Sequence, residues 1–195
     1  EKFIGKDNVS LILGDNFFYG QSLTQILKRN INLSHGAKIF IHPVKNPHLY
    51  GIASLNKRKK IINLIEKPKK TKSNLAVTGL YFFDSKVVEF TKRLKPSKRN
   101  ELEIVDLINL YKSKKKLSTT KLGRGSAWMD VGNFSDLQSI SNFVQNIENR
   151  QSYKIGCIEE IALNKKWINK TNILNRIRSN AENNYTKYLK NLISI

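Results

Sequence analysis

The sequence predicts an α/β fold with a mixed sheet, followed by a helical C-terminal region. Two patterns indicate this. Between Val9 and Phe83, short apolar runs alternate with turn-forming residues, which is typical of strands. After Asp84, apolar residues recur mostly at helical spacing. The 195 residues, of which 39% are hydrophobic, suffice for a domain with a sizeable core and exclude a disordered chain.

The strand-rich part begins with residues 9–13. The run Leu11-Ile12-Leu13 is apolar on both faces, so we expect a buried strand there, with neighbours on both sides in the sheet. A helix is expected over residues 21–30. Further strands are expected over residues 37–44, 52–55, 61–65 and 76–83, and residues 56–59 are expected to form a hairpin tip.

The second part is predicted to contain helices over residues 86–92, 101–111 and 135–149, with one strand over residues 117–122. From Glu159 onward the chain is expected to be helical. Apolar faces there would pack on the main body or on a partner subunit; they comprise Ile173, Ile177, Tyr185, Tyr188, Leu189 and Leu192. The single cysteine, Cys157, is expected to pack, since nothing nearby resembles the partner of a catalytic thiol.

The net charge is +20, from 35 Lys and Arg against 15 Asp and Glu, which suits nucleic acid or phosphorylated small molecules. The lysines form short clusters in apparent turns, without interleaved aromatic residues or a known nucleic-acid motif, so no specific nucleic-acid partner is expected. The alternative is that the positive charge reflects a lysine-rich composition and no ligand at all. The three histidines have no metal-ligand spacing. Neither a membrane partner nor a signal peptide is expected, and a cytoplasmic location follows by default.

Two aspartates in distinctive settings predict a divalent-metal site. Asp15 lies in LILGDNFFYG, directly after an apolar run, and Asp130 lies in GRGSAWMDVG. Asp15 should therefore lie at the carboxyl end of a strand, where open α/β sheets bind ligands. The alternative is that Asp15 caps the helix expected near residue 21.

Eight ordered segments, spanning nearly the whole chain, resemble glucose-1-phosphate thymidylyltransferase. They are LILGDNFFYG, the turn at residues 49–51, IEKP at residues 65–68, SNLAVTGLYFFD, NELEIVD, GRGSAWMDVG, ENRQ and EEIALNKKWI. The family's Gly-rich G-x-G-T-R-L-x-P signature and its nearby Lys do not occur here. The resemblance implies a Rossmann-like nucleotidyltransferase fold that is N-terminally truncated. Residues 1–151 would be the central and C-terminal part of that domain, and residues 152–195 a helical extension.

The resemblance implies transfer of a thymidylyl group from dTTP to glucose 1-phosphate, with Mg²⁺ held by Asp15 and Asp130 as catalytic and metal-binding residues. Carboxylate oxygens suit Mg²⁺. The implied substrate-binding residues are Gly14, Tyr50, Gly51, Glu66, Lys67, Val77, Thr78, Gly79, Glu101 and Trp128. Among these, Gly51 would allow close backbone approach, Glu66 would accept hydrogen bonds from sugar hydroxyls, and Lys67 would attract the phosphate. Four of these residues also have a simpler explanation. Glu66 and Lys67 could belong to an exposed strand end, and Val77 and Trp128 could be ordinary core residues.

Three positions depart from the family pattern: Asn100, Val131 and Phe134 stand where Gly, Thr and His are usual. They bear on substrate preference more than on reaction class. The first hypothesis is an enzyme that is inactive or weakly active as an isolated fragment. The resemblance implies that it assembles into a homo-oligomer, a tetramer. The second is a non-catalytic module that binds a sugar phosphate or mediates oligomerisation. The residues do not decide between dTTP and UTP.

Overall fold

The computed structural model describes residues 2–21, 23–31, 33–98 and 100–194. The chain divides into two compact units, Glu1–Asp136 and Leu137–Ile195, which are described separately. Within the described residues, no helix is both long enough and apolar enough to cross a membrane.

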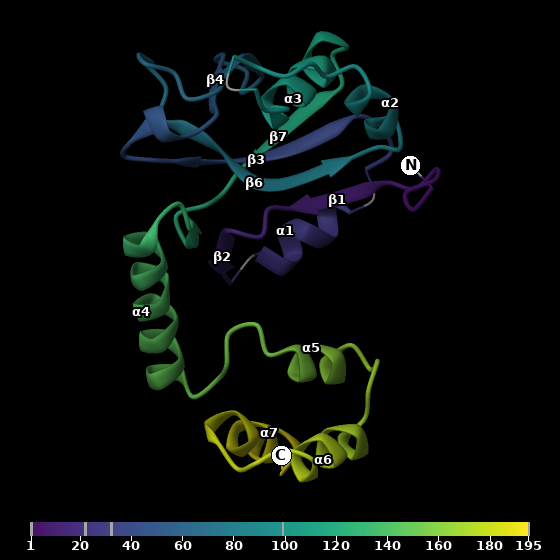
Figure 1. Ribbon diagram of the computed structural model, residues 1–195, viewed down its shortest axis with the longest axis vertical. Helices are drawn as coiled ribbons and strands as arrows, with labels where there is room; N and C mark the ends of the chain where they lie inside the picture. The colour runs from purple at the N-terminus through teal and green to yellow at the C-terminus, as the bar shows by residue number, and fades with distance from the viewer. Residues whose placement is uncertain (1, 22, 32, 99, 195) are drawn as a thin grey trace. The chain divides into compact units, whose positions relative to one another are not determined.

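The first unit is built on a six-stranded mixed sheet, as Figure 1 shows. Its strands are β1 (Val9–Ile12), β3 (Ala37–Pro43), β4 (Ile52–Leu55), β5 (Ile61–Ile65), β6 (Leu75–Phe83) and β7 (Leu117–Lys121). The strand order is β5-β4-β6-β3-β7, and β1 pairs with β6 outside this path. Strands β3 and β7 are parallel, whereas the other pairs are antiparallel. The predicted α/β class with a mixed sheet is therefore confirmed.

The long strand β6 organises the sheet. Strand β3 pairs along one of its edges, with an irregularity between Ile39 and Ile41. Two strands share the other edge: β4 pairs with residues 75–76 and β1 pairs with residues 80–83. Residues 77–79 of β6 therefore lie between the end of β1 and the start of β4. This interruption positions the candidate site.

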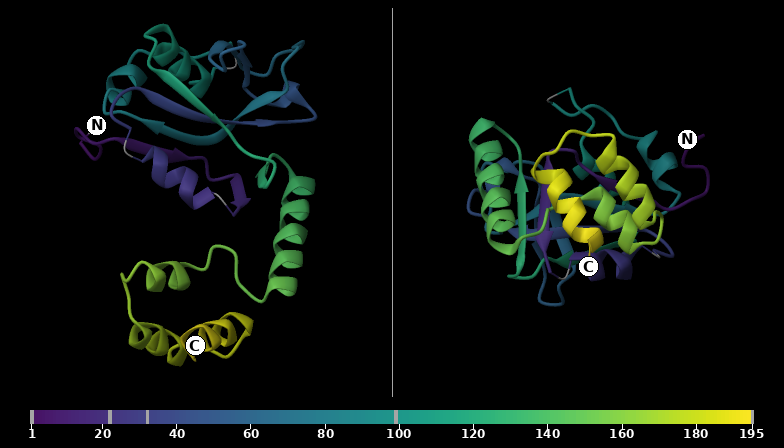
Figure 2. Two further views of the ribbon diagram at one scale, coloured as in Figure 1. Left: turned by 180° about the vertical axis from the view of Figure 1, so that it is seen from behind. Right: turned by 90° about the horizontal axis from the view of Figure 1, so that it is seen from below.

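Alternating side chains of the central strands bury two separate cores. On one face, Ile39 and Ile41 belong to a cluster with residues of α2 (Val87–Thr91) and α3 (Ile104–Ser113). On the other face, Phe40 packs with Leu80 and Phe82, and α1 (Leu23–Asn30) covers this cluster. Figures 1 and 2 show α2 and α3 on one side of the sheet and α1 on the other.

A second, two-stranded sheet pairs segments that are far apart in sequence. Strand β2 (Asn16–Gly20) runs antiparallel to β8 (Ser126–Asp130), with Asn16 opposite Asp130 and Phe18 opposite Trp128. The sequence analysis predicted neither strand. The aromatic rings of Phe18 and Trp128 pack against the Phe40 cluster, so this small sheet is anchored on the same face as α1.

Most predicted elements of the first unit are confirmed within one to three residues. Strands β4 and β5 match in full, and α3 begins at Ile104, three residues later than predicted. The hairpin tip is confirmed by the Lys59 N–H, which donates to the carbonyl of Asn56 at 2.9 Å. A short 3-10 helix, η1 (Pro47–Leu49), was not predicted. The predicted start of α1 includes residue 22, which lies outside the described residues.

The expectation of a buried first strand was wrong. Leu11, Ile12 and Leu13 are 36%, 56% and 37% exposed. The reason is that β1 pairs with β6 alone among the described strands, so it forms an edge. An apolar run shows that a strand is suited to burial, whereas the elements that pack around the strand determine how much of it is buried.

The second unit is helical, as predicted. Helix α4 (Phe134–Gln151) begins in the last residues of the first unit, and α5 (Ile158–Asn164), α6 (Lys170–Arg178) and α7 (Asn184–Ser194) follow. Cys157, Ile173, Ile177 and Leu189 form the buried core among α5, α6 and α7, which confirms the predicted apolar faces and the packing of Cys157. Figures 1 and 2 show α6 and α7 side by side. The functional division at residues 151 and 152 stays a prediction.

Candidate active site

A small cavity of about 150 Å³ opens where β1 ends and β4 begins on the edge of β6. Most of the site residues expected from the sequence line it: Asp15, Tyr50, Gly51, Glu66, Val77, Gly79, Trp128 and Asp130. These residues come from the end of β1, the start of β4, the end of β5, the middle of β6 and strand β8. The fold therefore brings together residues that are spread over more than half of the sequence.

The small sheet brings the two aspartates to one place. Asp130 ends β8 opposite Asn16, and the next ladder contact is the Val131 N–H, which donates to the carbonyl of Asp15 at 2.7 Å. Each carboxylate is held by a neighbour. Asn16 Nδ2 donates to Asp15 Oδ1 at 2.8 Å, and the Tyr50 hydroxyl donates to Asp130 Oδ1 at 2.9 Å. Backbone pairing and side-chain hydrogen bonds together fix both carboxylates at the cavity.

Asn16 connects three parts of the site, and the sequence analysis did not single it out. Its Oδ1 accepts from the Gly79 N–H at 2.9 Å and from Trp128 Nε1 at 2.6 Å, while its Nδ2 donates to Asp15. A Cβ on Gly79 would lie only 2.5 Å from the Asn16 side chain, so only glycine allows this approach. The signal in the sequence was the Gly14-Asp15-Asn16 turn, which was interpreted through its aspartate alone.

Tyr50 and Trp128 form an aromatic wall of the cavity, with ring centroids 5.3 Å apart. Burial, the hydrogen bond to Asp130, and the charges of Asp130 and Asp136 raise the pKa of Tyr50 to about 12. The phenol therefore stays protonated and keeps donating to Asp130. Burial, followed by the charges of Glu66 and Asp15, also raises the pKa of Tyr81 above its ordinary value. Burial is the largest cause of both shifts, and the neighbouring carboxylates add to it.

The start of β4 brings Glu66 close to a glycine backbone. The Gly51 carbonyl accepts from the Val77 N–H at 2.8 Å, and the Tyr50 carbonyl accepts from the Lys67 N–H at 3.0 Å. A Cβ on Gly51 would lie 2.8 Å from Val105 Cγ2 and 3.0 Å from Glu66 Oε2. Glycine at position 51 therefore leaves room for the Glu66 carboxylate beside the cavity.

Four of the expected residues do not line the cavity. Gly14 and Glu101 are exposed, and Lys67 is an exposed residue at the end of β5 with a positive φ of 39°. Thr78 is fully buried, and its hydroxyl donates to the carbonyl of Phe40 at 3.2 Å, on the β3 side of the strand. The binding roles expected for these four residues stay predictions. Trp128 lines the cavity and also packs against the Phe40 cluster, so its core packing is confirmed and its substrate-binding role stays a prediction.

The donor set at the cavity fits Mg²⁺. Asp15 and Asp130 offer hard carboxylate oxygens on one cavity. Within the described ranges, no group of three or more His, Cys, Asp and Glu residues is arranged to hold a metal. Magnesium commonly takes one or two carboxylates and completes its octahedron with water and substrate phosphates, so two aspartates are a sufficient protein contribution.

Comparison with known proteins decides the family. The family described as "Nucleotidyl transferase" matches residues 1–147. Glucose-1-phosphate thymidylyltransferase from Neisseria meningitidis is 47% identical over 193 residues, which cover 99% of this chain and 67% of that protein. The protein of the same name from Mycobacterium tuberculosis is 40% identical, over 97% of this chain and 66% of its own length. The chain belongs to the glucose-1-phosphate thymidylyltransferase family.

Solved structures agree with this family. A crystal structure from Bacillus anthracis, assigned to the glucose-1-phosphate thymidylyltransferases, is 39% identical with a TM-score of 0.63 and covers 73% of this chain and 56% of that one. A UDP-glucose pyrophosphorylase in complex with UDP-glucose has a TM-score of 0.64 at 23% identity, which shows the shared fold alone. The chain thus has the Rossmann-like nucleotidyltransferase fold. It spans about two thirds of the length of the curated relatives.

Proposed function

We propose that this chain carries the metal and sugar-phosphate side of an enzyme that transfers a thymidylyl group from dTTP to glucose 1-phosphate. A phosphate oxygen of the sugar phosphate attacks the α-phosphorus of dTTP, the bond to the β-phosphate breaks, and pyrophosphate leaves with the bonding electrons. The observation that carries the proposal is the convergence of Asp15 and Asp130 on one cavity with Tyr50, Gly51 and Glu66. The names of the relatives supply the substrates.

The residues of the cavity have complementary tasks in such a reaction. Two anions must approach each other, so positioning and charge compensation dominate the rate. Asp15 and Asp130 would hold Mg²⁺, whose charge offsets that of the phosphate oxygens when it is bound. Tyr50 fixes Asp130, and Asn16 fixes Asp15.

The sugar is expected at the start of β4. Glu66 and Gly51 line the cavity there, and Glu66 would accept hydrogen bonds from sugar hydroxyls. Lys67 follows Glu66 directly and would contribute positive charge toward the phosphate. No nucleophilic side chain is required, because the substrate supplies the attacking oxygen.

The test is product formation from dTTP and glucose 1-phosphate with Mg²⁺. It compares this chain alone with the chain preceded by the segment that carries the family's G-x-G-T-R-L-x-P signature. We expect dTDP-glucose from the longer protein and little or none from the chain alone. Asp130→Ala in the longer protein should abolish the product, whereas undiminished turnover would refute the metal assignment.

A non-catalytic sugar-phosphate-binding module is the second candidate, favoured by the fact that the cavity gathers the residues of the sugar and metal side. Calorimetry separates the two. The module predicts binding of glucose 1-phosphate in the absence of dTTP and no product in either protein. Tight dTTP binding by this chain alone excludes it. The homo-oligomer and the cytoplasmic location stay predictions.

A further inference from the structure

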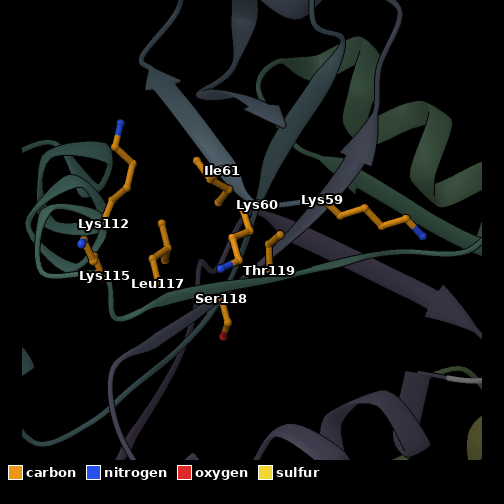
Figure 3. A pocket seen from close by; sticks show the side chains of 8 residues that line it. All are labelled: Lys59, Lys60, Ile61, Lys112, Lys115, Leu117, Ser118 and Thr119. Carbon is orange, nitrogen blue, oxygen red and sulfur yellow. The ribbon is translucent and has the colours of Figure 1, made fainter. Parts of the chain in front are cut away.

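A second and larger cavity, of about 600 Å³, lies away from the aspartates. It is bounded by the β4–β5 hairpin, the end of α3 and the start of β7, and Figure 3 shows its side chains. Strands β5 and β7 are the two ends of the path β5-β4-β6-β3-β7, yet they contact each other here. The cavity is therefore formed where the curved sheet brings its opposite edges together.

The charged lining of this cavity has one sign. Lys59 and Lys60 come from the hairpin and Lys112 and Lys115 come from the end of α3, and among the residues that the structure describes no Asp or Glu lines the cavity. The ion pairs recorded among the described residues involve other lysines and arginines. Four lysines from two segments thus line one hollow, and a bound anion would lower the repulsion among their ammonium groups. One of these groups, Lys112 Nζ, also donates to the Ile62 carbonyl at 3.3 Å.

The backbone at two of these lysines is strained. Lys59 and Lys115 adopt positive φ values of 59° and 55°. The hairpin tip and the end of a helix are positions where glycine or asparagine adopts this conformation more easily. Lys67 and Lys166 also adopt positive φ outside this cavity, so the feature specific to Lys59 and Lys115 is that both line the same hollow.

A buried hydroxyl group in the wall has no partner. Thr119 Oγ1 is buried and makes no hydrogen bond within the described part of the chain. Its neighbour Ser118, by contrast, donates to the carbonyl of Ala37 at 3.2 Å. In Figure 3, Lys60, Leu117 and Thr119 lie between Lys59 on one side and Lys112 and Lys115 on the other. A ligand that occupied the cavity would lie against the central lysine and against the Thr119 side chain.

We propose that this cavity binds an oligophosphate group, the chemistry shared by inorganic polyphosphate and nucleoside triphosphates. Several phosphates in a row match several ammonium groups spread around a hollow, and lysine binds phosphate as a point charge. The volume lies in the range of small-molecule sites. The lining contains Ile61 and Leu117 but no aromatic ring, so it lacks the stacking platform on which proteins bind single-stranded nucleic acid.

The test is isothermal titration of the 195-residue chain with sodium tripolyphosphate in the absence of divalent metal. The decisive variant is Lys60→Gln with Lys112→Gln. The matched control is Lys69→Gln with Lys70→Gln, which removes the same charge from exposed positions outside the cavity. We expect the first pair to weaken binding at least about tenfold, since charge-assisted contacts are lost, and the second to leave it nearly unchanged. No binding by the unaltered chain, or equal loss in both pairs, overturns the proposal.

Two further measurements complete the test. Thr119→Val removes the unpartnered hydroxyl group at nearly constant volume, so we expect weaker tripolyphosphate binding with an unfolding midpoint that is not lowered; unchanged binding contradicts a ligand at that wall. Titration with dTTP and with ATP shows whether a nucleoside adds affinity to the phosphate chain. A single-stranded oligonucleotide that binds more tightly than tripolyphosphate, and loses its affinity in the Lys60 and Lys112 variant, would overturn the small-ligand assignment.

Discussion

Replacing Asn16 by alanine should destabilise the first unit by about 2 kcal/mol. The change leaves the Gly79 N–H and Trp128 Nε1 without their acceptor and removes the donor to Asp15. An unsatisfied buried donor costs about 1–3 kcal/mol. Both hydrogen bonds are only partly buried, so the lower end of that range applies to each donor.

Urea unfolding followed by tryptophan fluorescence measures this loss. Trp167 is 74% exposed and lies in the second unit, so a Trp167→Phe background isolates the signal of Trp128. Asn16→Asp is the matched variant. It keeps an acceptor for both donors and should therefore be more stable than Asn16→Ala, yet it places a second carboxylate beside Asp15.

The two Asn16 variants should also differ in metal binding. Mn²⁺ titration followed by electron paramagnetic resonance should show altered affinity in Asn16→Asp, because the charge of the site changes. A free energy of unfolding for Asn16→Ala within about 0.5 kcal/mol of the unaltered chain, the usual range for surface substitutions, would refute the role of Asn16 as the connecting residue.

Three other expectations concern single side chains. Gly79→Ala should displace Asn16 and lower stability, because the new Cβ would lie 2.5 Å from that side chain; a crystal structure with the Asn16 contacts intact would contradict this. The raised pKa of Tyr50, about 12 against an ordinary 10.0, contributes stability that is present below pH 10 and lost as the pH rises toward 12. The difference in unfolding free energy between Tyr50→Phe and the unaltered chain should shrink over that interval, and a constant difference would argue against the hydrogen bond to Asp130. Burial alone would raise the pKa of Glu159, but the hydrogen bonds from Tyr185 and Arg176 lower it below its ordinary 4.5. Its contribution is therefore present above that value and lost in acid, so Glu159→Gln should flatten the acid limb of the stability curve, as acid titration of the circular dichroism signal can check.

Local patterns were sufficient for most of the fold. The alternation along residues 37–44 and 76–83 predicted β3 and β6, and the helical spacing after Glu159 predicted the core of the second unit. These signals succeed because each element buries its own apolar face. The burial of β1 could not be predicted in this way, since an edge strand and a central strand share the same apolar run.

The pairing that builds the candidate site was beyond local patterns. Residues 16–20 follow a turn and precede a helix, and residues 126–130 lie in a glycine-rich segment, so neither stretch shows the alternation of an independent strand. Each becomes a strand because it pairs with the other, which lies 114 positions away at the Asn16 and Asp130 pair. The two aspartates were predicted to cooperate, but the ladder that joins them, and Asn16 as its connecting side chain, required the structure.

The shared edge of β6 sets the spacing of the two halves of the cavity. The Leu13 N–H donates to the Gly79 carbonyl and the Val77 N–H donates to the Gly51 carbonyl, so the Asp15 half and the Gly51 half of the cavity are both held by one strand. The two attachment points are two residues apart on that strand, which at about 3.3 Å per residue is about 7 Å. The chain between Asp15 and Gly51, which runs through α1 and β3, is far longer. Its length has no influence on the distance between the two halves of the cavity. Insertions in the turn before β3 should therefore leave the geometry of the cavity intact, whereas one extra residue between Val77 and Gly79 would move one half of the cavity relative to the other.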